Sequence, residues 1–122
     1  MITPRLQARS FAKINLALSV LGRRTDGYHE IRTLFQTIDL CDDIEFRPSR
    51  NLELVCENLP GVPREDNLVW KAANALASRI PGRRGARIIL RKRVPAGSGL
   101  GGGSSNAAAT LLGLMRFWRL GE

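Results

Sequence analysis

The sequence has few cysteines, few aromatic residues and no long apolar run, and each shortage excludes a class of protein. Cys41 and Cys56 are the only cysteines, and without CxxC spacing they form neither a zinc site nor a disulfide framework. We therefore expect two reduced, partly buried thiols in a cytoplasmic protein. No apolar run approaches the roughly 20 residues that span a bilayer. The N-terminal stretch MITPRLQARSFAK also lacks the apolar region of a secretory signal.

Acidic residues are outnumbered by basic ones, at 11 Asp and Glu against 19 Lys and Arg, which gives a net charge of +8. This excess suits an anionic partner such as nucleic acid, a nucleotide or a phosphorylated metabolite. The densest basic stretch, residues 79–93, is interpreted as a solvated face. It lacks the aromatic residues on which single-strand binders stack bases.

Apolar residues make up 43% of the chain, enough for the core of one small domain or part of a larger one. Their period of two over residues 11–21 predicts a half-buried strand, with Lys13 and Asn15 side by side on its less apolar face. An Asp-Gly turn signal follows within residues 22–30. Further strands are predicted at 31–40, 43–47, 51–57 and 86–94, with the sequence LCDD as a break between the first two.

Two helices complete the predicted pattern. The first begins at Asn67, with Asp66 or Asn67 as its N-cap, and is stopped by Pro81 and Gly82. The second covers residues 104–118. Strands followed by a helix, a strand and a helix indicate an α+β fold rather than regular βαβ alternation.

A glycine-rich stretch, PAGSGLGGGSSN at residues 95–106, separates the last predicted strand from the last helix. Glycine lets another group approach the backbone closely, and N–H groups at a helix start attract anions together with the helix dipole. Ser104, Ser105 and Asn106 are placed to cap these N–H groups or to offer hydroxyls to a phosphate. The stretch therefore predicts a phosphate-binding loop. A plain linker is the weaker interpretation because an apolar helix follows at once.

Two common phosphate loops do not fit this stretch. A Walker A loop requires lysine after its last glycine, where this chain has Ser104. Gly97, Gly99 and Gly102 do match GxGxxG. A dinucleotide fold, however, needs an acidic residue about 20 positions later at the end of a second strand. The one candidate is Glu122, which follows a helix instead.

The segment PAGSGLGGGSSNAAATL resembles the ATP-phosphate-binding motif of the GHMP kinases. The segments AKINLALSVLGRRTDGYHEIRTLFQTIDL and NLVWKAANAL are similar to the members of this family that phosphorylate the 2-hydroxyl of 4-diphosphocytidyl-2-C-methyl-D-erythritol, in non-mevalonate isoprenoid precursor biosynthesis. The resemblance covers nearly the whole chain in the same order. It implies a kinase that uses ATP and Mg²⁺. It also implies a GHMP kinase N-terminal domain, similar to domain 2 of ribosomal protein S5, over residues 1–122 in incomplete form, with the C-terminal domain absent.

Carried over residue by residue, the resemblance implies roles for particular side chains. Lys13 matches the catalytic lysine, and Asn15 matches its neighbour in the substrate pocket. Tyr28 and His29 match the pair that recognises cytosine, the tyrosine by stacking and the histidine partly through its backbone. The residues around the ATP phosphates would be Pro95, Gly97, Gly99, Leu100, Gly101, Gly102, Gly103, Ser104 and Ser105.

The catalytic aspartate of the family lies in a segment resembling GADVPFF, which these 122 residues do not contain. We therefore expect little or no kinase activity from this polypeptide alone. Two alternatives stay open. A basic S5-like nucleic-acid-binding module suits the net charge but lacks an aromatic platform. A GHMP kinase for another small molecule, such as homoserine or mevalonate phosphate, is disfavoured by the DGYHE turn.

Overall fold

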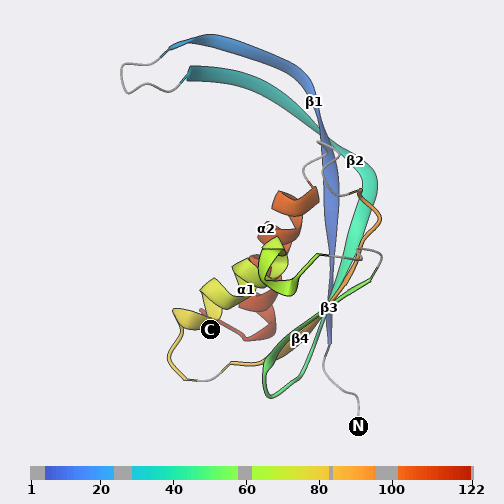
Figure 1. The fold of residues 1–122 in the computed structure, drawn as a ribbon, viewed down its shortest axis with the longest axis vertical. Coiled ribbons are helices and arrows are strands. Elements are labelled where there is room, and N and C mark those ends of the chain that lie inside the picture. The colour runs from blue at the N-terminus through green and yellow to red at the C-terminus, as the bar shows by residue number, and fades with distance from the viewer. Residues whose placement is uncertain (1–4, 24–28, 58–61, 83, 96–101, 122) are drawn as a thin grey trace.

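The computed structural model describes residues 5–23, 29–57, 62–82, 84–95 and 102–121, and within these it describes the backbone alone for residues 14–23 and 29–38. Four described strands form one sheet in the order β1-β2-β4-β3, and two helices lie together on one of its faces (Figure 1). The elements are β1 (Leu6–Arg23), β2 (His29–Arg47), β3 (Leu52–Glu57), the short 3-10 helix η1 (Arg64–Asp66), α1 (Leu68–Ser78), β4 (Ala86–Arg91) and α2 (Gly102–Phe117).

Strands β1 and β2 form a long antiparallel ribbon that extends beyond the rest of the sheet and curves (Figure 1). Its pairing runs from Leu6 opposite Phe46 to Arg23 opposite His29, with irregularities near Ala12, Leu16 and Leu21. Bulges of this kind bend a ribbon and increase its twist, which accounts for the curvature. Strand β2 also pairs antiparallel with β4, and β4 pairs parallel with β3.

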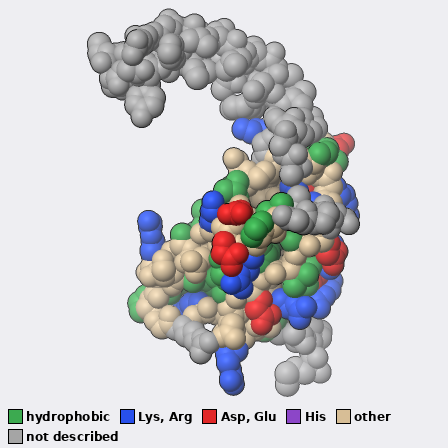
Figure 2. Space-filling model, in the orientation of Figure 1, with side chains coloured by type: hydrophobic (Ala, Val, Ile, Leu, Met, Phe, Trp, Pro, Cys, Tyr) green, Lys and Arg blue, Asp and Glu red, His purple; other side chains and the backbone are tan. Residues whose placement is uncertain are grey.

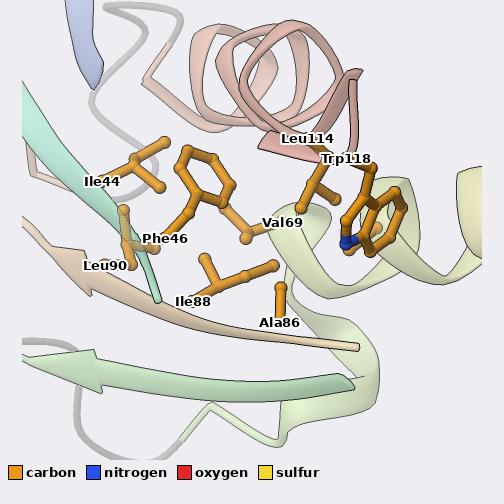
Figure 3. Close-up of a cluster of buried hydrophobic side chains, with 9 residues drawn as sticks. Ile44, Phe46, Val69, Ala86, Ile88, Leu90, Leu114 and Trp118 are labelled. Carbon is orange, nitrogen blue, oxygen red and sulfur yellow. The ribbon is translucent and has the colours of Figure 1, made fainter. Parts of the chain in front are cut away.

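The core lies between the sheet and the two helices, as Figure 3 shows. Because side chains alternate along a strand, Ile44 and Phe46 of β2 and every second residue of β4 from Ala86 point toward the helices. Fully burying a large apolar side chain contributes about 1.5–3 kcal/mol, so this cluster is the main source of stability. Its members are Ile44, Phe46, Val69, Ala73, Ala86, Ile88, Leu90, Leu114 and Trp118.

Both predicted helices are present, with ends that differ slightly from the prediction. Asn67 is the N-cap of α1, and its side-chain oxygen accepts a hydrogen bond of 2.9 Å from the Val69 N–H, as predicted. The helix ends at Ser78, before the predicted stop. Helix α2 begins at Gly102, two residues earlier than predicted, and ends at Phe117.

The predicted break at LCDD is wrong, because β2 continues without interruption through these residues. Strand β1 pairs with this part of β2, with Ser10 opposite Asp42 and Phe11 opposite Cys41. The predicted strand at 11–21 is correspondingly longer, covering Leu6–Arg23. The residues interpreted as a break include Asp42, whose side chain is fully buried among hydrogen-bond donors.

Both cysteines are free thiols in the structure and are half-buried. Burial raises the pKa of the Cys56 thiol, so this group is a poor nucleophile at neutral pH. Neither described helix is both long and apolar enough to cross a membrane.

Candidate functional site

The N-terminal end of α2 lies where β1, the end of β4 and the start of α1 meet. Gly102 is buried against the residues after β4, and a Cβ atom added there would lie 2.9 Å from Val94 Cγ1. A Cβ atom at Gly103 would lie 2.9 Å from Leu68 Cδ1, at the start of α1. Both glycines have helical backbone, so here glycine serves close packing of the helix start rather than an unusual conformation.

The first turn of α2 has the features of an anion-binding helix start. The first N–H groups of any helix lack acceptors within the helix, and the dipole makes this end positive. No acidic residue lies in this first turn, and Gly103 and Ser104 are exposed. A phosphate group would therefore meet backbone donors and a hydroxyl here without opposing charge.

A buried ion pair lies beneath this helix start. Lys92 Nζ donates a hydrogen bond of 2.6 Å to Asp42 Oδ2. The other carboxylate oxygen, Oδ1, accepts from the backbone N–H groups of Arg93 at 2.5 Å and Val94 at 2.8 Å. These two N–H groups are therefore bound to a side chain instead of to a neighbouring strand. As a result β4 ends at Arg91, whereas the prediction extended this strand to Val94.

Asn106 connects this ion pair to α2 and β1. Its side-chain Nδ2 donates to Asp42 Oδ2 at 2.9 Å and to Ser10 Oγ at 2.7 Å, while its Oδ1 accepts from Lys92 Nζ at 3.0 Å. Ser10 in turn donates to Ser105 Oγ at 2.8 Å. Ser10, Asp42, Lys92, Ser105 and Asn106 are called the polar cluster below. Within the described part of the chain, every buried side-chain nitrogen and oxygen has a hydrogen-bond partner.

The charge state of Asp42 follows from these contacts. Burial by itself raises the pKa of this carboxyl group. The hydrogen bonds from Lys92, Val94, Arg93 and Asn106 outweigh burial and hold the pKa of Asp42 below its ordinary value. Asp42 is therefore ionised at neutral pH, and it balances the positive charge of Lys92 beneath the helix start.

The predicted catalytic lysine lies on the strand that passes this helix end. Lys13 is half-buried on β1, three residues beyond Ser10, or about 10 Å along the strand at the usual rise per residue. The pairing of β1 with β2 has no irregularity from Lys13, opposite Thr37, to Asn15, opposite Phe35. Lys13 and Asn15 therefore lie on the same face of β1, as predicted.

Only some of the other predicted site residues lie in the described part of the chain. His29 begins β2 opposite Arg23, at the far end of the ribbon. Pro95 is exposed directly before the glycine-rich stretch, Ser104 is exposed in the first turn of α2, and Ser105 is half-buried against Ser10. The remaining predicted positions lie outside the described residues, namely Tyr28, Gly97, Gly99, Leu100 and Gly101.

Sequence reasoning named Ser105 and Asn106 at the helix start but missed their partners Ser10, Asp42 and Lys92 in the polar cluster. Residues 79–93 were interpreted as a solvated face, and for Lys92 this is wrong, since its side chain is buried. A signal was present in the alternation of the strands: Lys92 continues the inward series of Ile88 and Leu90. In the same way, Asp42 precedes the inward residues Ile44 and Phe46 of β2. Polar residues at core positions of two adjacent strands predict a buried pair.

Four arginines on the opposite face of the sheet contact carboxylates. Arg93 contacts Asp43 at 2.8 Å, and Arg91 contacts Glu57 at 3.4 Å. The carboxylate of Glu45 is buried beside the guanidinium groups of Arg47, Arg5 and Arg91. On the face of the molecule shown in Figure 2, Lys and Arg are interspersed with Asp and Glu instead of forming one continuous patch.

Comparison with known proteins gives one consistent result. Residues 67–122 match the GHMP kinases N terminal domain. The chain is 48% identical over 122 residues to a 4-diphosphocytidyl-2-C-methyl-D-erythritol kinase of Methylococcus capsulatus, covering 99% of this chain and 42% of that protein. A related kinase of Pseudomonas syringae pv. syringae is also 48% identical, with 99% and 43% covered.

Solved structures agree with these sequence relatives. A crystal structure of 4-(cytidine 5'-diphospho)-2C-methyl-D-erythritol kinase superposes with a TM-score of 0.77 at 41% identity, covering 96% of this chain and 42% of that one. The mevalonate kinase of Methanococcus jannaschii, at 16% identity and a TM-score of 0.67, shares the fold alone. The chain spans less than half the length of the relatives it matches. It belongs to the GHMP kinase family and has the α+β fold of that family's N-terminal domain.

Proposed function

We propose that this chain provides the ATP-binding part of a kinase that phosphorylates the 2-hydroxyl of 4-diphosphocytidyl-2-C-methyl-D-erythritol. The observation that carries the proposal is the N-terminal end of α2. It is free of acidic residues and bound through Ser105 and Asn106 to the strand that bears Lys13. The sequence relatives that bear this enzyme's name support the choice of substrate.

Phosphoryl transfer depends mainly on holding the reactants in place and on neutralising the charge that develops on the transferred group. In this proposal, the first N–H groups of α2 and the Ser104 hydroxyl bind phosphate oxygens of ATP. Lys13 supplies a positive charge near the reacting hydroxyl or phosphate. Asn15, on the same face of β1, contacts the substrate.

Recognition of the substrate base is assigned to the turn between β1 and β2. Tyr28 offers a flat aromatic face on which cytosine stacks, and His29 contributes partly through its backbone. In the described part of the ribbon, the last pair is Arg23 with His29, and His29 follows Tyr28 in the sequence. In this proposal, the base is therefore recognised by residues other than those that bind phosphate.

Magnesium would accompany the nucleotide. In the described part of the chain, no group of three or more His, Cys, Asp or Glu residues is arranged to hold a metal ion. Mg²⁺ usually binds through substrate phosphates and one or two carboxylates, with several waters retained. The described residues therefore offer no ready-made centre of three such ligands, and no step of this proposal passes through the metal.

The proposal is tested by titrating ATP onto the 122-residue chain in a calorimeter and by measuring ADP release with the cytidine diphosphate substrate. We expect saturable ATP binding that weakens in the Lys13→Met variant. The matched control is Lys71→Met, which removes the same charge from an exposed position on α1. Absence of ATP binding by the unsubstituted chain, or equal weakening in both variants, would contradict the proposal. We expect ADP release to be weak or absent.

Nucleic-acid binding is the competing function, since the net charge is +8. The ion pairs of Arg91 and Arg93 reduce the free positive charge of the sheet face. An RNA mobility-shift series at increasing salt separates the two functions. Tight RNA binding at physiological salt without any effect of ATP would favour the nucleic-acid module.

A further inference from the structure

The polar cluster joins the two ends of the glycine-rich stretch through a single carboxylate. Asp42 accepts four hydrogen bonds, two on each oxygen. Three of the donors, on Lys92, Arg93 and Val94, directly precede the stretch, and the fourth is on Asn106, the last residue of the stretch, which lies in α2. A carboxylate has about four acceptor sites, so this one is fully used.

The same cluster fixes the helix start relative to β1. Ser10 of β1 lies within hydrogen-bond distance of both Ser105 and Asn106 of α2. Asp42 belongs to β2, at the position paired with Ser10. The strand that carries Lys13, the residues before the glycine-rich stretch and the first turns of α2 therefore share one buried set of hydrogen bonds.

A buried ion pair is a weak means of adding stability, because the cost of removing both charges from water offsets most of their attraction. Its hydrogen bonds, in contrast, have strict distances and directions, and they fix the backbone groups that they contact. At this position the fixed groups are the two ends of the segment proposed to bind phosphates. The location of the pair thus points to a positioning role.

We propose that Asp42 is a positioning residue that holds the two ends of the glycine-rich stretch, so that the first N–H groups of α2 are preorganised for the phosphates of ATP. This inference rests on the proposed function for the identity of the ligand. The claim that Asp42 holds the backbone does not depend on the ligand, and hydrogen exchange tests it without any ligand.

The test compares Asp42→Asn with Asp43→Asn in the 122-residue chain. Asparagine keeps the size of Asp42 and one oxygen for the Arg93 and Val94 N–H groups, but its amide nitrogen accepts nothing from Lys92 or Asn106. Asp43 is the matched control, since it is the next residue, is half-buried, and also contacts Arg93, through the guanidinium at 2.8 Å.

Two quantities are measured, both under conditions where circular dichroism shows each variant to be folded. Hydrogen exchange of residues 106–109, the first amides of α2 that are bonded within the described helix, is expected to accelerate in Asp42→Asn at least about tenfold more than exchange in β3 and β4 does. ATP affinity by calorimetry is expected to fall by at least about tenfold, because preorganisation is lost. Asp43→Asn is expected to stay within about twofold of the unsubstituted chain in both.

Each other outcome has a defined meaning. Exchange that accelerates equally in all strands, or an unchanged ATP affinity in the folded Asp42→Asn variant, overturns the positioning role. If the unsubstituted chain binds no ATP, the proposed function fails. The exchange measurement then still decides whether Asp42 holds this segment.

A second variant covers the case in which Asp42→Asn does not fold. Asn106→Leu keeps a similar volume and leaves the Asp42–Lys92 pair intact, but it removes the link between that pair and α2. We expect faster exchange at residues 106–109, unchanged exchange at Arg93 and Val94, and at least about a tenfold loss of ATP affinity. Unchanged exchange and affinity in this variant overturn the proposal.

Discussion

Lys92 and Asp42 form an ion pair that is buried on both sides, with Lys92 Nζ 2.6 Å from Asp42 Oδ2 and the two side chains 7% and 0% exposed. The two residues are 50 positions apart in the chain and belong to segments that reach the same point beneath α2. A charged pair at this depth has to be complete, because either member left alone is a buried charge without its counter-ion. This condition leads to the first prediction.

Removal of one member of this pair should lower the free energy of unfolding far more than removal of both members. We expect Asp42→Asn to lower the free energy of unfolding by about 3–5 kcal/mol, since the Lys92 ammonium loses its buried carboxylate. The double variant Asp42→Asn/Lys92→Met should recover a large part of this loss, because the second charge is gone as well. Urea denaturation followed by tryptophan fluorescence measures all variants.

The pair at the surface provides the reference for this comparison. Arg93 and Asp43 contact each other at 2.8 Å, but the Arg93 side chain is 58% exposed. Asp43→Asn should therefore change the free energy of unfolding by less than about 1 kcal/mol. Equal losses in Asp42→Asn and Asp43→Asn would show that burial of the Asp42–Lys92 pair has no special consequence.

Stability should fall in acid, and Asp42 should account for part of the fall. The pKa of Asp42 is lower in the folded chain than its unfolded value of about 3.9, so between these two pKa values only the unfolded chain binds the proton. The contribution of Asp42 is thus complete above the unfolded pKa, and it is lost as pH falls through the folded pKa. Glu45 acts in the same direction, because its pKa is also lowered.

This dependence is measured as the urea midpoint between about pH 3 and about pH 7. The Asp42→Asn/Lys92→Met variant has no titrating group at position 42 and should show a shallower fall below about pH 4. A parallel fall in both proteins would mean that Asp42 does not have a lowered pKa in the folded state.

Local patterns were sufficient to predict much of the fold from the sequence. The N-cap at Asn67, the alternation of β3 and the apolar period of α1 are short-range features, and each was confirmed. The placement of Lys13 and Asn15 on one face also followed from local alternation, because the irregularities of β1 lie on either side of this pair. Local alternation within a single strand predicts which residues share a face when no bulge intervenes.

Alternation marks Asp42 and Lys92 as inward positions, but local patterns do not show that the residues of the polar cluster meet. Asp42 was interpreted as part of a break between strands and Lys92 as part of a solvated face, because each has its partner far away in the sequence. Only the pairing of β1 with β2, and of β2 with β4, brings Ser10, Asp42 and the residues after β4 together. The energy of a buried charge depends on these long-range contacts, which no window of neighbouring residues contains.

The two described glycines at the start of α2 should respond differently to alanine. The Cβ atom in Gly102→Ala would lie 2.9 Å from buried Val94 and 3.4 Å from Lys92 Nζ, so we expect a loss of about 1–3 kcal/mol in the free energy of unfolding. In Gly103→Ala the clash is with the end of Leu68, which is 42% exposed and free to move, so a change below about 1 kcal/mol is expected. Thermal denaturation of both variants checks this order, and a reversed order would contradict the packing role of Gly102.

Cytidine recognition should depend on the aromatic face of Tyr28. If cytosine stacks on this ring, Tyr28→Ala should weaken the binding of a cytidine nucleotide by about 1–3 kcal/mol, the range found for bases stacked on aromatic side chains. Tyr28→Phe keeps the ring and removes only the hydroxyl, so it should bind the nucleotide nearly as well as the unsubstituted chain. Calorimetric titration with cytidine diphosphate measures the three affinities, and ATP affinity serves as an internal control, since the proposed phosphate site on α2 consists of other residues. If Tyr28→Ala left cytidine binding unchanged, the base would be held elsewhere, and the DGYHE turn would no longer argue for a cytidine-linked substrate over the other small molecules that GHMP kinases phosphorylate.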